Sequence, residues 1–318
     1  MNAEIYAEWY RRQGYRVIHS DSSYWYEASR GAFQAFPFHW VIKPSENELR
    51  SIFQKRWTFA LRYSTPLDSP YGSVSYHAVY NAPAYSLDLL DRRSRQNIRA
   101  GLQNCRVERI PLLRLAEDGW QLEVDTTTRQ DRKIAYTKEQ WFRRYQAAAD
   151  LPGFEAWGAL VNDRLVASIL AFIVDDCCEL ISQQCHHDYL PAKVNNALTY
   201  TITQEMINRP EVHSIFYTLQ SLDAPPSVDD FKFRMGYSAR KLRQRVVFHP
   251  LTQYAIQPFS YRIFTQLRRL FPESSLISKT QGMMRFYLNG RLPIEKQNWP
   301  ECLREEKSSN TIVEPQSS

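Results

Sequence analysis

The sequence lacks an apolar segment long enough to cross a lipid bilayer. One of its most apolar stretches, residues 165–174, has ten residues, whereas a membrane-spanning helix needs about 20. The first 18 residues carry acidic and basic side chains alike and lack the apolar core of a signal peptide. We therefore expect a cytoplasmic protein without a transmembrane segment.

The sequence also lacks the cysteine pattern of a disulfide framework. Its 5 cysteines are an odd number and show no CxxC spacing, which indicates a reducing compartment. His186 and His187 follow Cys185, but adjacent histidines on an extended segment are expected to point apart. No second pair of ligands is spaced to complete a zinc site, so we expect no metal.

Length and composition bound the architecture more than the function. The chain has 318 residues, which suggests about two domains, and an apolar content of 43% is enough for a packed core. The formal net charge of +6 favours anionic partners in general. Coenzyme phosphates, a tRNA, an acidic glycan and a membrane surface all fit this charge, and it does not choose among them.

Apolar runs and turn residues predict an ordered set of strands and helices in the second half of the chain. The order is strand, strand, strand, helix, strand, helix, strand. The predicted strands are residues 156–161, 165–174, 178–185, 213–219 and 237–248, and the predicted helices end at Arg209 and Gly236. Three antiparallel strands followed by a crossover helix predict a mixed sheet.

The segment around the last predicted helix carries a family resemblance. It reads Phe231, Lys232, two further residues, Met235, Gly236 and Tyr237, and glycine at a helix end adopts the left-handed cap conformation without steric cost. With the preceding order of elements, this pattern resembles the GNAT acyltransferase superfamily. It is most similar to the branch that holds Fem-type aminoacyl transferases and their acyl-CoA-using relatives.

The resemblance implies an α/β (α+β) fold with two GNAT-like lobes. Each lobe would be a mixed, mostly antiparallel sheet flanked by helices, followed by a C-terminal helical extension. The implied divisions are residues 1–132 for a degenerate N-terminal lobe, 133–250 for the C-terminal lobe, 251–300 for the helical extension and 301–318 for a disordered tail. The last part is polar and has few large hydrophobic side chains.

The N-terminal half contributes a helix with a basic stripe, predicted within residues 85–110. Arg92, Arg95 and Arg99 fall within roughly 60° of one another at 100° per residue. The pattern R-x-N-I-R resembles a helix that Fem-type proteins place in their first lobe, and these arginines are then substrate-binding candidates together with Tyr217. A helix with a solvated basic face explains the stripe equally well.

The resemblance also implies where a donor would bind. In GNAT proteins the fourth and fifth strands splay apart around the pantetheine arm. The resemblance assigns residues 178–185 and 213–219 to these two strands, and we expect them to lie side by side, run parallel and diverge at their C-terminal ends. The loop before the next helix wraps the pyrophosphate, where free helix N–H groups favour anions. The residues implied here are Ser182, Gln183 and Gln184 for the arm and Lys193, Asn195 and Asn196 for the phosphates. The family's loop is rich in glycine, whereas residues 187–196 contain none.

Three residues are candidates for catalysis. Lys232 occupies the position at which many GNAT enzymes carry a tyrosine that protonates the leaving thiolate, and Fem-like proteins tend to have lysine there. A cation could stabilise the thiolate, although a helix-surface lysine is the alternative. Asp223 and His186 follow predicted strands and could act as a general base, or they could be turn and surface residues.

We therefore predict an acyltransferase that moves an acyl group from acyl-CoA, as its co-substrate, to an amine or hydroxyl on a small molecule, glycan or peptide. The alternatives are an aminoacyl-tRNA-dependent transferase and a catalytically inactive GNAT fold that binds a ligand or partner. A nucleic-acid-binding protein that uses the arginine stripe is a further alternative, but it lacks a recognised reading motif. The predicted helix around residues 260–270 could also lie on a membrane surface.

Overall fold

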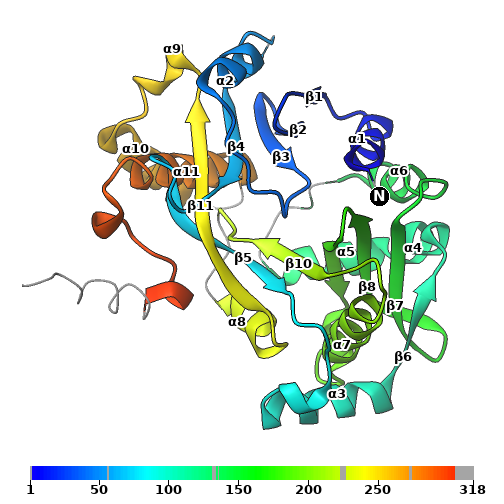
Figure 1. The fold of residues 1–318 in the computed structure, drawn as a ribbon. Helices are drawn as coiled ribbons and strands as arrows, with labels where there is room; N and C mark the ends of the chain where they lie inside the picture. The colour runs from blue at the N-terminus through cyan, green and yellow to red at the C-terminus, as the bar shows by residue number, and fades with distance from the viewer. Residues whose placement is uncertain are drawn as a thin grey trace, which may run out of the picture.

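A computed structural model describes residues 2–55, 57–130, 134, 136–222, 227–271 and 274–304. One sheet of 11 strands runs through these residues, and helices cover both of its faces (Figure 1). The strand order is β1-β2-β3-β4-β11-β5-β10-β9-β8-β7-β6.

The strands have the following bounds: β1 (Val17–His19), β2 (Tyr24–Ser29), β3 (Ala32–Phe36), β4 (Ala60–Thr65), β5 (Ser73–Tyr80), β6 (Arg106–Ile110), β7 (Phe154–Val161), β8 (Arg164–Val174), β9 (Cys177–Cys185), β10 (Ser214–Leu219) and β11 (Ser238–Phe248). The five strands predicted in the second half of the chain correspond to β7, β8, β9, β10 and β11. Their predicted order is confirmed.

The α-helices are α1 (Ala3–Arg12), α2 (Glu46–Phe53), α3 (Arg92–Asn104), α4 (Leu112–Asp118), α5 (Trp120–Arg129), α6 (Lys138–Gln146), α7 (Val194–Ile207), α8 (Ser227–Arg234), α9 (Pro250–Gln253), α10 (Pro258–Leu270) and α11 (Ser275–Asn289). Helix α3 begins at Arg92 rather than within the preceding residues, because the side chain of Asp91 accepts the N–H of Ser94 and caps the helix there.

The two halves of the chain share strands in the middle of the sheet. Strand β5, from the N-terminal half, pairs antiparallel with both β10 and β11, and β11 then pairs with β4. A strand from the first half therefore lies between two strands of the second half. One sheet thus combines strands from both halves of the chain. The division into two lobes at residue 132 stays a prediction.

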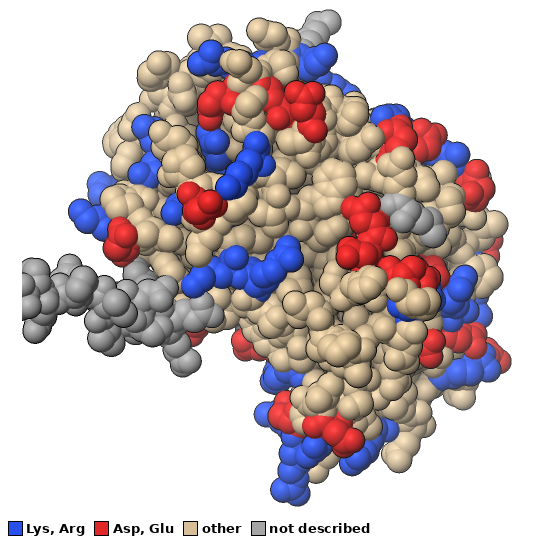
Figure 2. Space-filling view, in the orientation of Figure 1, with Lys and Arg blue, Asp and Glu red and all other residues tan. Residues whose placement is uncertain are grey.

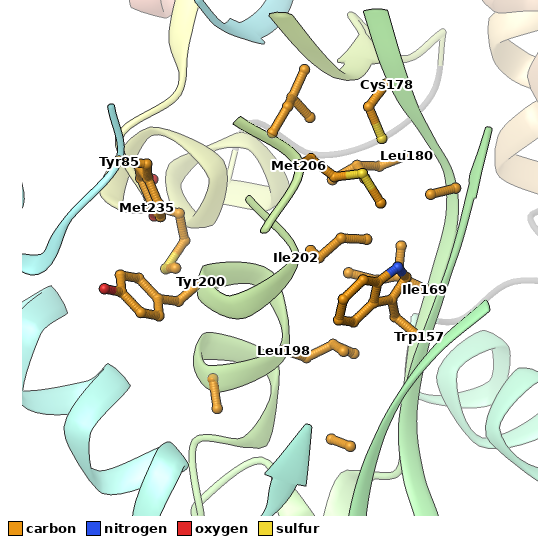
Figure 3. Packing of buried hydrophobic residues seen from close by; sticks show 14 of the residues in the cluster. Tyr85, Trp157, Ile169, Cys178, Leu180, Leu198, Tyr200, Ile202, Met206 and Met235 are labelled. Atoms are coloured by element: carbon orange, nitrogen blue, oxygen red, sulfur yellow. The ribbon is translucent and has the colours of Figure 1, made fainter. Parts of the chain in front are cut away.

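The largest core cluster lies between α7 and the strands β7, β8 and β9. Leu198, Ile202 and Met206 are spaced by four residues and project from one side of α7 towards Trp157 and Ile169 (Figure 3). All three α7 side chains are fully buried. The same residues whose helical spacing predicted α7 therefore hold it against the sheet. The N-terminal end of α7 is held in place by the same packing.

The C-terminal extension packs on strands from both halves of the chain. Helix α11 contacts β11 and β5, and α10 contacts α11. Residues 301–304 of the predicted tail are folded: Leu303 is only 1% exposed and belongs to a cluster with Trp299 and Val74. Residues 305–318 of the predicted tail lie outside the described residues. Within the described chain, no helix combines the length and apolar character needed to span a membrane.

Candidate functional site

Strands β9 and β10 form a fork in the sheet. They pair in parallel over three residues only, from Ser214 opposite Cys177 to Phe216 opposite Glu179. Both strands then continue, β9 along β8 and β10 along β5. We call the region beyond the Glu179–Phe216 pair the strand fork. The expectation that these two strands lie side by side, run parallel and diverge at their C-terminal ends is confirmed.

A β-bulge marks β9 just beyond the start of the strand fork. Leu170 of β8 lies opposite Ser182 and Ala171 lies opposite Leu180, so Ile181 is the extra residue on β9. A bulge interrupts the alternation of side chains and bends the strand. After the bulge, Gln183 faces α7, whereas Gln184 faces α5.

Polar side chains meet inside the strand fork. The amide nitrogen Nε2 of Gln183 donates to Asn195 Oδ1 at 3.3 Å and to Thr199 Oγ1 at 3.1 Å. The hydroxyl of Tyr217 donates to Gln183 Oε1 from the other strand. Gln183 therefore contacts both Asn195 and Tyr217, and all three residues were predicted from the sequence for donor or substrate binding.

Lys232 of α8 lies at the same place. Its Nζ is 5.5 Å from the centre of the Tyr217 ring, and the residue is 8% exposed. An ammonium group over an aromatic face gains electrostatic stabilisation. The alternative of an exposed helix-surface lysine is therefore wrong, because the side chain is buried beside the strand fork.

The N-terminus of α7 has the backbone shape that glycine usually supplies. Lys193 precedes the helix with φ of 61° in the left-handed region, and no side chain caps the helix there. This conformation costs a non-glycine residue about 1–2 kcal/mol. A loop without glycine thus still presents the first-turn N–H groups of α7. Asn196 Nδ2 lies 3.6 Å from the sulfur of Met235, which links this end of α7 to the end of α8.

A buried ion pair marks the start of the strand fork on the opposite face of the sheet. Glu179, only 1% exposed, accepts the backbone N–H of His39 at 2.8 Å, and its Oε1 is also 2.8 Å from His39 Nδ1. Its second oxygen, Oε2, makes no hydrogen bond of standard geometry among the described residues. The Tyr6 hydroxyl is its buried neighbour: burial and the Glu179 carboxylate raise the pKa of Tyr6. Burial alone would lower the pKa of His39, but the side chains of Cys177 and Glu179 outweigh it and raise this pKa to about 10.

This pKa predicts a pH-dependent contribution of His39 to stability. Because the folded pKa lies above the ordinary value of 6.5, the protonated form stabilises the fold, fully so below about pH 6.5. This stabilisation should be lost as the pH rises from about 6.5 to about 10. In urea unfolding, the free-energy difference between wild type and His39→Gln should shrink by a few kcal/mol, roughly, over that range. A difference that stays constant with pH would show that His39 is neutral in the folded protein.

An open pocket of about 590 Å³ lies next to this ion pair, and His39 is part of its wall. Residues from both halves of the chain line it, among them Trp40, Asp176, Ser214, Arg240 and Lys241. Besides His39, the pocket wall combines the Trp40 ring with two cations, Arg240 and Lys241, and one acid, Asp176. A polar molecule in this pocket would reach His39, which touches Glu179 at the start of the strand fork.

His186 and His187 do not point apart, contrary to the expectation from sequence. Their rings stack at 4.9 Å with an angle of 18°, because His187 begins a 3₁₀ turn instead of continuing the strand. The backbone N–H of His187 donates to Asp125 Oδ1 at 2.9 Å, and its ring contacts Asp125 Oδ2. The three side chains place ligand atoms within 4.8 Å of one another, which is a geometry that could hold a metal ion. Without an ion, His187 is bonded to Asp125, and His186 Nδ1 accepts the backbone N–H of Asp188 at 3.3 Å.

The remaining predicted residues lie elsewhere. Arg92, Arg95 and Arg99 lie on α3, which packs on α7 at the lower edge of the molecule in Figure 1. Gln184 donates to Glu123 of α5 at 3.1 Å on the face opposite Gln183. The Ser182 hydroxyl is buried and has no hydrogen-bond partner among the described residues. Asp223 lies outside the described residues.

Sequence reasoning missed Glu179 and His39. Glu179 is the one acidic residue in the apolar strand CCELISQQC, and a lone acid in a buried strand is a signal that could have pointed to it. His39 is 140 residues away in the sequence, and no local pattern connects it to β9.

No protein-family model matches this sequence, and no curated protein matches it. The structure is similar to the crystal structure of FemX, with a TM-score of 0.55, 10% identity, and coverage of 79% of this chain and 92% of FemX. It is also similar to the C-terminal domain of a putative lysylphosphatidylglycerol synthetase from Agrobacterium fabrum. The TM-score is 0.51, the identity is 10%, and the match covers 76% of this chain and 87% of that domain. The structure of L-PGS from Bacillus licheniformis is similar with a TM-score of 0.50, 10% identity, and coverage of 79% of this chain and 93% of L-PGS.

At this level of identity the similarities establish the fold alone. The fold expected from the resemblance, a Fem-like double-GNAT fold, is confirmed.

Proposed function

We propose that the protein is an acyltransferase that binds the acyl donor in the strand fork. The observation that carries this proposal is the pair of charged side chains at the strand fork, Lys232 on one face of the sheet and Glu179 on the other. Buried charges are costly and are kept where they are paired or functional. Strands that separate also expose backbone N–H and C=O groups to a ligand.

The donor arm would lie between β9 and β10, where Gln183 and Tyr217 now contact each other. Backbone groups of β9 beyond the bulge would bind the arm, and the first turn of α7 with Lys193 would bind phosphates. This arrangement fits acyl-CoA as the donor. An aminoacyl-tRNA has its reactive ester next to a ribose and phosphates as well, so it is the competing donor and belongs in the same assay.

The acceptor would enter through the pocket at His39. Its amine nitrogen attacks the thioester carbonyl carbon, the C–N bond forms, and the C–S bond then breaks. Glu179 Oε2 takes the proton from the amine, directly or through one water. Lys232 stabilises the thiolate, which leaves as the thiol after it takes up a proton. A hydroxyl acceptor would follow the same steps and give an ester.

Isothermal titration with acetyl-CoA and longer acyl-CoAs tests donor binding. The charge-reversal variant Lys193→Glu should weaken binding at least about tenfold, because it places an anion beside the phosphates. Lys193→Gly is the matched control for the backbone: it should raise the free energy of unfolding by about 1 kcal/mol by relieving the left-handed conformation. If no acyl-CoA gives a binding signal in the titration and the protein transfers the aminoacyl group from aminoacyl-tRNA, the donor is aminoacyl-tRNA and not acyl-CoA.

A fold that binds its ligand without turnover is the second candidate. The lysine at position 232 favours it, because many GNAT enzymes carry at that position the tyrosine that protonates the leaving thiolate. The two candidates differ in one result. A ligand-binding protein would bind acyl-CoA and leave it intact in the presence of amine and hydroxyl acceptors, whereas a transferase would release CoA.

A further inference from the structure

Helix α10 has two apolar sides, and only one of them is buried. Tyr261 and Phe264 face the cluster formed by α11 and β11. Phe259, Ile263 and Leu270 lie within about 40° of one another on the opposite side, at 100° per residue. They are 73%, 45% and 71% exposed. We call these three residues the α10 stripe. An amphipathic helix on a globular protein needs one apolar side only, so the second side is unexplained by folding.

The exposed apolar surface continues beyond α10. Phe271 directly follows the stripe, and Leu276 lies in the first turn of α11, which contacts α10. The preceding helix α9 adds Leu251 and Tyr254. All four side chains are more than half exposed. Single exposed hydrophobic residues are ordinary, but a concentration in one short stretch of chain indicates an interaction site.

The chain segment that carries the stripe has charges almost all of one sign. Residues 250–294 contain six basic residues and one acidic residue, Glu273, which gives a local net charge of +5. Arg262 and Arg269 are exposed and flank the stripe on the same side of α10. Basic side chains also gather over the region of α10 in Figure 2. The basic residues of this stretch are Arg262, Arg268, Arg269, Lys279, Arg285 and Arg291.

From these observations we propose that α10 docks on an anionic lipid bilayer. An interfacial helix buries its apolar side at the boundary between headgroups and acyl chains, while flanking cations bind anionic headgroups. The α10 stripe and its arginines have this arrangement. A second copy of the chain fits less well, because packing the stripe against itself would bring Arg262 and Arg269 close to the same residues of the other copy.

This docking goes beyond the proposed transferase activity and needs neither donor nor acceptor. It would place the protein on a membrane without a spanning segment. Each apolar side chain that enters the interface adds to the affinity in proportion to its buried area, and each cation near an anionic surface adds a smaller, salt-dependent share.

Co-sedimentation of the full chain with phosphatidylcholine vesicles, with and without phosphatidylglycerol, tests the proposal. Wild type should bind the vesicles that contain phosphatidylglycerol, and binding should weaken at high salt. The variant Phe259→Gln/Leu270→Gln should lose at least about tenfold in partition coefficient. Leu89→Gln/Leu113→Gln is the matched control, since these leucines are also exposed, at 62% and 46%, but lie on other elements. It should bind as wild type does.

Three results would overturn the proposal. Wild type could bind no better with phosphatidylglycerol than without it, or the α10 variant could bind as tightly as the control. In the third, size-exclusion chromatography could show a wild-type dimer that the α10 variant splits while its vesicle binding is unchanged, so that the stripe is an interface between copies. All substituted residues are exposed, so circular dichroism should show that every variant folds.

Discussion

Glu179→Gln should lower kcat by about 100-fold or more in an acyl-transfer assay. A positioned base typically contributes about 10²–10⁴-fold, and the glutamine keeps the shape and the acceptor oxygen for the His39 N–H but cannot take a proton. Because Glu179 is buried beside His39, the single variant also leaves a buried cation unpaired, which costs about 3–5 kcal/mol when the partner charge is lost. Activity and thermal stability must therefore be measured together.

Two further variants separate chemistry from folding at Glu179. The double variant His39→Gln/Glu179→Gln removes both charges and should recover stability but not activity. Glu155→Gln is the matched control: this acid on β7 is also largely buried and pairs with Arg209 at 2.8 Å, away from the strand fork. It should change stability while kcat stays as in wild type. Full activity of the double variant would show that the His39–Glu179 pair only holds the loop after β3 to β9.

Lys232→Met should lower kcat at least about tenfold, which corresponds to 1.4 kcal/mol of transition-state stabilisation. Methionine keeps the aliphatic stem and the buried volume and removes the charge. Groups that stabilise developing negative charge in a dry site typically supply about 2.7–4 kcal/mol. Substrate affinity should change less than kcat, because the thiolate exists only after the C–S bond begins to break.

The control for Lys232 is Lys138→Met, the same substitution at an exposed position at the start of α6. It should leave both kcat and the melting temperature unchanged. Normal turnover by a well-folded Lys232→Met protein would assign Lys232 a packing role against the Tyr217 ring. If Lys232→Met does not fold, Lys232→Arg is the variant to test. Arginine keeps the charge and should retain activity if the site needs a charge there.

The order of elements was predictable from the sequence because each element of the second half has a strong local pattern. The strands β8 and β9 are apolar runs between turn residues, and Leu198, Ile202 and Met206 give α7 its helical period. Gly236 adopts φ of 86° as its place between helix and strand required. The insertion of β5 between β10 and β11 was not predictable, because pairing between distant strands leaves no mark in local periodicity.

The candidate site was predictable where its residues are close in sequence to a family pattern. Gln183, Asn195, Tyr217 and Lys232 meet in the strand fork, as the divergence of two parallel strands implied. The Glu179–His39 pair depends on the loop after β3 folding across β9, which is a tertiary contact. The predicted orientation of the His186 and His187 side chains was wrong. A 3₁₀ turn, stabilised by Asp125 of α5, replaces the extended backbone assumed from the strand.

The crystal structure of the protein with a non-hydrolysable acyl-CoA analogue is the most direct test of the central claim that the donor binds in the strand fork. We expect the pantetheine chain between β9 and β10 beyond Glu179, the pyrophosphate at the first turn of α7, and Tyr217 separated from Gln183. An analogue bound elsewhere on the protein, with Tyr217 and Gln183 still in contact across the fork, would contradict the claim.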